Sequence, residues 1–129
     1  MVGLVIVSHS EKVAQGVKEL ASQMASGLPI AAAGGTSDGR LGTDMGKILN
    51  AINEVYSQDG VLIIFDLGSA YMNAEMALEF LEEDMRNNVE IIDTAIVEGA
   101  ITAAVESSIG KTMSEIKEAV KNMSLGKMP

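Results

Sequence analysis

Short runs of consecutive apolar residues alternate along the chain with stretches in which apolar residues recur every three or four positions. The runs are rich in Val and Ile, which is typical of strands that are buried on both faces of a sheet. The recurring positions are typical of helices with one buried side. The predicted strands span Val2–Val7, Pro29–Ala33, Val61–Phe65 and Val89–Ile92.

A helical stretch follows each predicted strand. The first carries the stripe Val13, Val17, Leu20 and Met24, and the second carries Met45, Ile48, Leu49, Ile52 and Val55. The third extends from about residue 70 to about residue 85, with one stripe of Tyr71, Ala74, Leu78, Leu81 and Met85 and a second of Met72, Met76 and Phe80. A fourth runs from about residue 95 to 109 and ends before Gly110, and a last helix starts at the capping box of Thr112 and Glu115.

This alternation predicts an α/β fold, with an open, mostly parallel four-stranded sheet between helices on both faces. Three layers of this kind fit one domain, and we assign the whole chain, residues 1–129, to it. The segment after about residue 124 is expected to fray.

Composition narrows the range of functions. Nine basic and 18 acidic residues give a net charge of −9, which disfavours binding to nucleic acids and to anionic membranes. The chain has no cysteine and one histidine, which argues against thiol chemistry and against a protein-held metal. Because no apolar run is long enough for a membrane span or preceded by basic residues like a signal peptide, we expect a cytoplasmic protein.

Polar and glycine-rich residues follow the strands, at the edge where open parallel sheets bind ligands. The sequence places Ser8, His9 and Ser10 after the first strand, Gly34, Gly35 and Thr36 after the second, and Asp66, Leu67, Gly68 and Ser69 after the third. Ser8 and Glu11 have capping-box spacing, which predicts that His9 lies in the first turn of the first helix. The free amides there would favour an anion such as a phosphoryl group.

Each of these residues has a structural as well as a functional interpretation. His9 can be a half-exposed residue without a role, and Asp66 can be a turn or cap residue. In the functional interpretation, Asp66 accepts a hydrogen bond from one ring nitrogen of His9 and leaves the other nitrogen free to attack. Other candidates for phosphate contacts are Gly34, Gly35, Thr36, Lys12 and Arg40.

Three segments together resemble a known family. They are VIVSHSEKVAQG, AAAGGTSDGRLGTD and LIIFDLGSAYMNAEMALE, which surround His9, Gly35 and Asp66. They resemble the DhaM phosphotransferase subunits of the phosphoenolpyruvate-dependent dihydroxyacetone kinase, whose fold is similar to the mannose-class IIA domain of the sugar phosphotransferase system. The resemblance implies strand order 2-1-3-4, phosphorylation of His9 and a partnering role for Asp66. It also implies that the loops of the active site contribute Ser10, Gly35, Thr36, Leu67, Gly68 and Ser69.

The resemblance further implies a homodimer that accepts phosphoryl from phospho-HPr and passes it to ADP on the nucleotide subunit of the kinase. Mg-ADP is then expected on that subunit, with no cofactor on this chain. Some family members continue into phosphocarrier and enzyme I-like domains; since this chain stops at Pro129, we expect HPr to act in trans. Two alternatives stay open: a mannose-class IIA domain of a sugar permease, and a non-catalytic regulatory or ligand-binding module. The short turn at Leu67–Ser69 favours the dihydroxyacetone branch over the permease.

Overall fold

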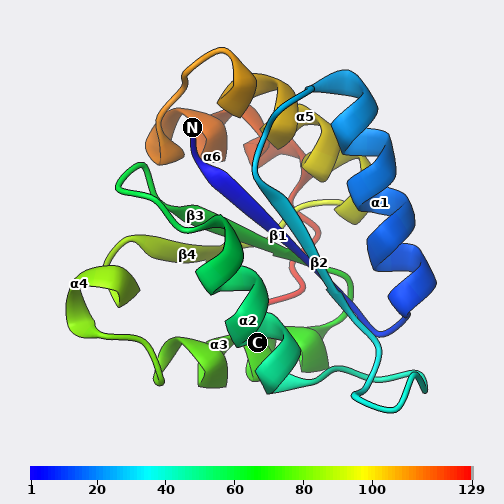
Figure 1. The fold of residues 1–129 in the computed structure, drawn as a ribbon. Helices are drawn as coiled ribbons and strands as arrows, with labels where there is room; N and C mark the ends of the chain where they lie inside the picture. Colours follow the sequence, from blue (N-terminus) through cyan, green and yellow to red (C-terminus); the bar gives the residue numbers. More distant parts are fainter. Residues whose placement is uncertain (129) are drawn as a thin grey trace.

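Within residues 1–128, which the computed structural model describes, four parallel strands form one sheet in the order β2-β1-β3-β4 (Figure 1). The strands are β1 (Gly3–Ser8), β2 (Ile30–Gly34), β3 (Val61–Phe65) and β4 (Val89–Ile92). The helices are α1 (Glu11–Met24), α2 (Met45–Val55), α3 (Gly68–Leu78), α4 (Glu83–Arg86), α5 (Ile96–Ser108) and α6 (Met113–Ala119), followed by a 3-10 turn at Lys121–Met123. The predicted fold class and strand order are confirmed.

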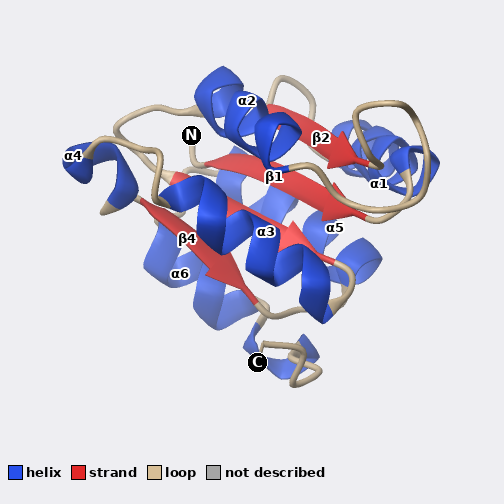
Figure 2. Ribbon diagram, turned by 90° about the horizontal axis from the view of Figure 1, so that it is seen from below, coloured by secondary structure: helices blue, strands red, loops and turns tan. Residues whose placement is uncertain are grey.

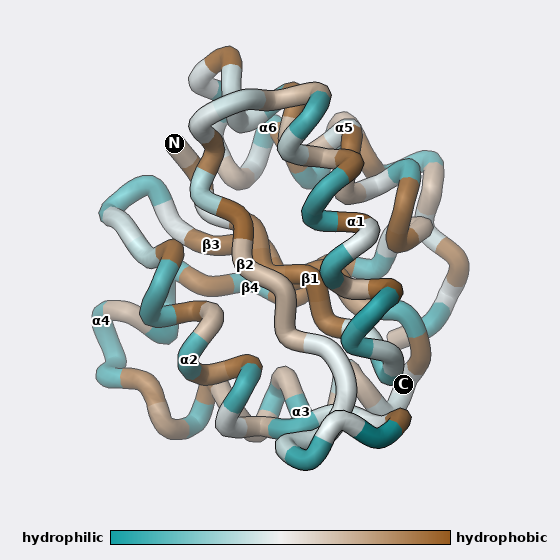
Figure 3. The backbone as a smooth tube through the Cα atoms, turned by 45° about the vertical axis from the view of Figure 1, so that its right-hand side comes forward, coloured by the Kyte–Doolittle hydropathy of each residue, from teal (hydrophilic) through white to brown (hydrophobic). Residues whose placement is uncertain are grey.

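Two groups of helices cover opposite faces of the sheet (Figure 2). Helices α1, α5 and α6 pack against the face that carries Leu4, Ile6, Leu62 and Ile64, and α2 and α3 pack against the face that carries Val5, Val7, Ile63 and Phe65. These side chains are fully buried. Because β1 and β3 are covered on both faces, their sequences are continuously apolar, and Figure 3 shows them as the apolar centre of the molecule.

Helix α1 does not pack against the sheet with the side that carries the predicted stripe of large apolar residues. The buried positions are Ala14, Val17 and Ala21, and the exposed ones include Val13, Leu20 and Met24, which are 43%, 51% and 62% exposed. Alanine is short enough to let a helix lie close against a strand, so the small residues pack inward. Of the predicted stripe, only Val17 is therefore buried.

Gly34 is a point of close approach between β2 and α1. A Cβ atom at this position would lie 2.7 Å from Cβ of Ala14 and 2.8 Å from Cα of Glu11. We expect Gly34→Ala to lower the free energy of unfolding by about 1–3 kcal/mol, because backbone must move to admit the methyl group. Gly16→Ala is the matched control: nothing lies within 4 Å of its Cβ position, and the change should add up to about 1 kcal/mol by helix propensity. Denaturant unfolding measures both, and equal effects would contradict the packing argument.

The predicted helix from about residue 70 to 85 is interrupted. Helix α3 ends at Leu78, and the following amides bond three residues back instead of four. The guanidinium of Arg86 donates to the carbonyls of Leu78 and Leu81 at 3.2 and 3.0 Å, which supplies partners at the end of the helix. The break lets Leu81 enter the core, where it is 6% exposed.

Two predicted helix boundaries are confirmed. Thr112 and Glu115 form a capping box at the start of α6, with side chain to backbone bonds in both directions. Gly110, after α5, has a φ of 88°, a conformation that glycine adopts without strain. None of the helices within residues 1–128 has the length and apolar character needed to cross a membrane.

The C-terminal segment from Ser124 to Met128, which was expected to fray, is bonded to the residue that follows β4. The carboxylate of Asp93, which follows β4, accepts hydrogen bonds from the amides of Leu125 and Lys127 at 3.1 and 2.6 Å. Two backbone groups bonded to one charged acceptor hold the segment against the carboxyl end of the sheet.

Candidate functional site

The register of β1 and β3 brings the two central candidate residues together. Val7 pairs with Phe65, and the amide of Asp66 donates to the carbonyl of Val7 at 3.2 Å. The chain then leaves both strands at the same edge of the sheet, so His9 and Asp66 become neighbours although 57 positions separate them in the sequence. This edge is the one at which the sequence placed the site.

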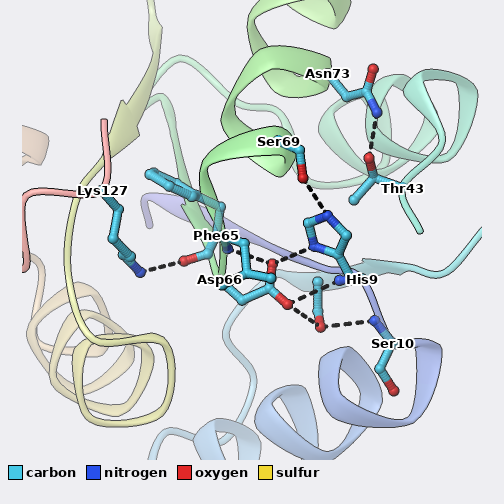
Figure 4. Close-up of polar contacts among 10 residues, drawn as sticks. His9, Ser10, Thr43, Phe65, Asp66, Ser69, Asn73 and Lys127 are labelled. Carbon is cyan, nitrogen blue, oxygen red and sulfur yellow. Dashed lines mark hydrogen bonds and ion pairs between the residues drawn. The ribbon is translucent and has the colours of Figure 1, made fainter. Parts of the chain in front are cut away.

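The imidazole of His9 is held between two side chains (Figure 4). Its Nδ1 lies 3.0 Å from Oδ1 of Asp66, and its Nε2 lies 2.5 Å from Oγ of Ser69. A carboxylate only accepts, so we assign the ring proton to Nδ1, with the Ser69 hydroxyl donating to Nε2. The His9 side chain is 25% exposed and that of Asp66 is 20% exposed, which leaves the ring within reach of a partner.

Asp66 is an ionised acceptor surrounded by donors. Besides the ring of His9, it accepts from the amide of His9 at 3.0 Å, the hydroxyl of Ser8 at 2.8 Å and the amide of Leu67 at 2.7 Å. Burial disfavours its charge, but the bonds from His9, Ser8 and Leu67 outweigh that effect and lower the pKa of Asp66 below its ordinary value of 3.8. A negative charge therefore stays beside Nδ1 at neutral pH.

Helix α1 starts later than the capping-box spacing predicted. Its N-cap is Ser10, whose hydroxyl accepts from the amide of Val13 at 3.2 Å, so His9 precedes the helix instead of lying in its first turn. Ser8 is fully buried. Its hydroxyl donates to Asp66 and accepts from the amide of Ser10 at 3.0 Å. Ser8 thus orients Asp66, a role that the sequence did not reveal, and the Ser10 side chain caps α1.

The helix N-terminus at the imidazole belongs to α3. Leu67 is its N-cap, and Gly68 and Ser69 are its first two residues. The first amides of a helix have no carbonyl partner within it, and its dipole favours a negative group there. Of the three predicted loop residues, Ser69 contacts the ring, Leu67 contacts Asp66, and Gly68 lies between them.

The loop after β2 makes its polar contacts mostly within itself. Gly35 is buried, and its amide donates to the carbonyl of Ser8 at 3.1 Å. The hydroxyl of Thr36 donates to Asp38 at 2.5 Å and accepts from the amide of Arg40 at 3.1 Å. Arg40 is 80% exposed and pairs with Asp38 at 2.9 Å. The Thr36 hydroxyl is thus bonded to its own loop.

Another part of this loop does contact His9. The amide of Gly42 donates to the carbonyl of His9 at 2.7 Å, and the side-chain amide of Asn73 on α3 donates to the hydroxyl of Thr43. These bonds connect α3, the loop and the segment that carries His9. The sequence did not predict these bonds, because a glycine at position 42 signals a turn but not which backbone group its amide will meet.

The arrangement suits a covalent carrier of an electrophilic group. The carboxylate of Asp66 can hold the proton on Nδ1, and it would stabilise a positive ring if Nε2 gained a bond. Ser69 and the start of α3 lie where a negatively charged group on Nε2 would be placed.

Comparison with known proteins gives consistent matches over nearly the whole chain. A family model described as the PTS system fructose IIA component, EIIA-man, matches residues 3–117. The phosphoryl donor subunit DhaM of the PEP-dependent dihydroxyacetone kinase 2 of Listeria innocua is 38% identical over 124 residues, which cover 95% of this chain and 99% of that protein. The DhaM subunit of Lactococcus lactis is 37% identical over 125 residues, or 97% and 98% of the two chains. A crystal structure of a protein of unknown function has a TM-score of 0.84 and 37% identity, with 97% of each chain covered.

Proposed function

Because the chain belongs to the DhaM phosphoryl donor subunits, which have the EIIA-man domain, we propose that it carries a phosphoryl group on Nε2 of His9 for a dihydroxyacetone kinase. The observation that carries the proposal is the placement of the imidazole, with Nδ1 3.0 Å from Asp66 and Nε2 2.5 Å from Ser69 at the start of α3. One ring nitrogen is fixed as a donor, and the other keeps its lone pair for phosphorus.

In the first step the donor is a phosphohistidine on HPr. The lone pair of Nε2 attacks phosphorus, the nitrogen–phosphorus bond on HPr breaks, and its electron pair returns to the HPr imidazole. His9 then carries the phosphoryl group and a positive ring, whose Nδ1 proton faces the carboxylate of Asp66. The Ser69 hydroxyl, released from Nε2, donates to a phosphoryl oxygen, and the N-terminal end of α3 stabilises the added negative charge.

In the second step the acceptor is ADP on the nucleotide-binding subunit of the kinase. A terminal oxygen of ADP attacks phosphorus, the bond to Nε2 breaks, and the neutral imidazole and ATP are formed. That ATP then phosphorylates dihydroxyacetone. Catalysis on this chain consists of holding the imidazole in one tautomer and orientation and of stabilising the charges that form on the ring and on the phosphoryl group.

Labelling in stages tests the proposal. The chain is incubated with phosphoenolpyruvate, enzyme I and HPr, and its intact mass is measured; one phosphoryl group per chain is expected. Adding the nucleotide-binding subunit with ADP should discharge the label to ATP, and then adding the dihydroxyacetone-binding subunit with dihydroxyacetone should move it to dihydroxyacetone phosphate. A chain that is labelled but does not discharge to the kinase subunits would instead fit a IIA domain of a sugar permease, and an unlabelled chain would fit a regulatory module.

We also propose that the chain forms a homodimer through α3. The inner side of this helix is buried through Ala70, Ala74 and Ala77. Its outer side carries the apolar residues Met72 and Met76, and Phe80 continues this stripe in the turn that follows the helix; the three side chains are 59%, 53% and 66% exposed. A second copy related by a two-fold axis would present the same stripe, so the two stripes cover each other. Burial of apolar surface on this scale favours association by about 25 cal/mol per Å².

Sedimentation equilibrium at micromolar concentration is expected to give a mass of about 27 kDa, twice the chain mass of 13.5 kDa. Met76→Glu should shift the protein to the monomer, since two charges would face each other across the two-fold axis. Met24→Glu is the control, because Met24 on α1 is exposed to a similar extent, 62% against 53% for Met76, but lies outside the stripe. A monomeric native chain, or dissociation by both variants alike, would rule out this interface.

A further inference from the structure

The segment after α6 returns to the edge of the sheet that holds the site. Asp93 holds this segment by accepting from the amides of Leu125 and Lys127, and the amide of Met128 lies 3.4 Å from the same carboxylate. The anchor fixes the backbone on both sides of Lys127. The side chain of Lys127 is thereby aimed at β3 and not at solvent (Figure 4).

The ammonium of Lys127 binds the ends of two neighbouring strands. Its Nζ donates to the carbonyl of Phe65 at 2.7 Å and to the carbonyl of Thr94 at 2.8 Å, and it lies 4.8 Å from the centroid of the Phe65 ring. Desolvation lowers the pKa of Lys127 below its ordinary value of 10.5, against the opposing effects of Asp93 and Asp66. A half-buried cation on two carbonyls and an aromatic face is a specific arrangement. Lys47, which is also half-buried, donates to one carbonyl, that of Gly34, at 3.0 Å.

Lys127 is bonded to one end of the turn between β3 and α3 and lies beside the other end. At one end it binds the carbonyl of Phe65, the residue directly before Asp66. At the other end, the carbonyl oxygen of Lys127 lies beside Gly68, the first residue of α3, 3.5 Å from the point that a Cβ atom would occupy there. The turn between these two points carries Asp66, and Ser69 directly follows it. These are the side chains that bind the two nitrogens of the His9 ring.

We propose that Lys127 is a positioning residue for phosphoryl transfer at His9: it holds the turn from Phe65 to Gly68 so that Asp66 and Ser69 stay on opposite nitrogens of the imidazole. The expected effect on the rate of phosphoryl transfer rests on the proposed function. Lys127 acts through the turn and makes no contact with the phosphoryl group. Its loss therefore affects the rate of transfer more than the binding of the phosphoryl donor.

Lys127→Met tests this role, because it keeps the length of the side chain and removes the ammonium. The rate of His9 labelling at saturating phospho-HPr should fall about ten-fold, with the KM for phospho-HPr changed less than about two-fold. Lys121→Met is the matched control, since Lys121 is exposed and, among residues 1–128, forms its ion pair with Glu118. Asp93→Ala releases the same segment but keeps the ammonium of Lys127. It should therefore also lower the labelling rate while changing the KM for phospho-HPr little. This variant tests the proposal if Lys127→Met fails to fold.

A second measurement does not depend on labelling. The chain has one histidine, so incorporating ¹⁵N-histidine gives the nitrogen signals of His9 alone. The native protein should show the tautomer with the proton on Nδ1, and Lys127→Met should show a mixture of tautomers while Lys121→Met does not. Native-like signals and rates in Lys127→Met would overturn the positioning role. A native chain that takes no label would overturn the proposed function, and the ¹⁵N signals would still decide whether Lys127 orders the ring.

Discussion

His9→Gln is expected to take up no phosphoryl group under conditions that label the native chain fully. The native label should amount to one group per chain and should be lost in mild acid, because phosphorus bonded to nitrogen hydrolyses there whereas phosphoserine survives. Glutamine fills similar space, but its amide nitrogen has no available lone pair for attack on phosphorus. Intact-mass measurement before and after acid treatment gives both results.

The fold of His9→Gln should be retained, because His9 lies between β1 and α1 with a quarter of its side chain exposed and outside both apolar clusters. Circular dichroism and a denaturant unfolding curve are the controls for this. Acid-stable label on Ser8, Ser10 or Ser69, in the native chain or in the variant, would contradict the assignment to His9. The three serines are the relevant competitors because they lie within the same cluster of hydrogen bonds.

The central strands could be predicted well because burial on both faces leaves a direct mark in the sequence. β1 and β3 are continuously apolar, and each is followed at once by the polar residues of the site. Parallel strands end at a common edge, so the proximity of His9 and Asp66 followed from their positions after these strands. The order of the strands was not contained in the pattern itself; it came from the resemblance to a known family.

The side of a helix that faces the sheet was harder to predict. In α1 the large residues Val13, Leu20 and Met24 point outward, and small ones pack inward because the helix runs close to β2 at Gly34. Periodicity indicates that a helix has an apolar side, but where a helix lies close to the sheet, small side chains occupy the buried side. The exposed large residues of α1 then look in the sequence like the buried stripe.

The end of α3 and the start of α1 were missed because distant residues determine them. Arg86, eight positions beyond Leu78, binds carbonyls at the break after α3. Ser8 has the spacing of a helix cap, but its hydroxyl binds Asp66 across the sheet, and the cap moves to Ser10. In both cases a contact with a residue outside the local sequence determines where the helix begins or ends.

The contacts of Lys127 beside the site could not be predicted from the local sequence either. Lys127 lies in the segment that was expected to fray, and 62 positions separate it from the carbonyl of Phe65 that it binds. No spacing rule connects the two. The residues found from the sequence are those that follow β1 and β3 directly, and the residues missed are those that support them from elsewhere.

Asp66→Asn is expected to slow phosphoryl transfer by about ten-fold or more. The asparagine carbonyl can still accept from Nδ1, but it lacks the negative charge that stabilises the positive ring. A hydrogen bond to a charged group is worth about 1.5–3 kcal/mol, against about 1 kcal/mol for a neutral one, and about 1.4 kcal/mol corresponds to ten-fold in rate. Rapid-quench measurement of His9 labelling at saturating phospho-HPr gives the rate.

The acid dependence of stability supplies the control for this variant. Because the folded-state pKa of Asp66 lies below its ordinary value of 3.8, the carboxylate stabilises the fold at pH values above 3.8, and this contribution disappears as the pH falls through the folded-state value. Asp66→Asn has no such group, so its free energy of unfolding should fall less steeply in that range. A variant that transfers phosphoryl at the native rate, yet shows the altered acid dependence, would make Asp66 a structural turn residue: its hydrogen bonds to His9 and Ser8 would then order the end of β1 without assisting the chemistry.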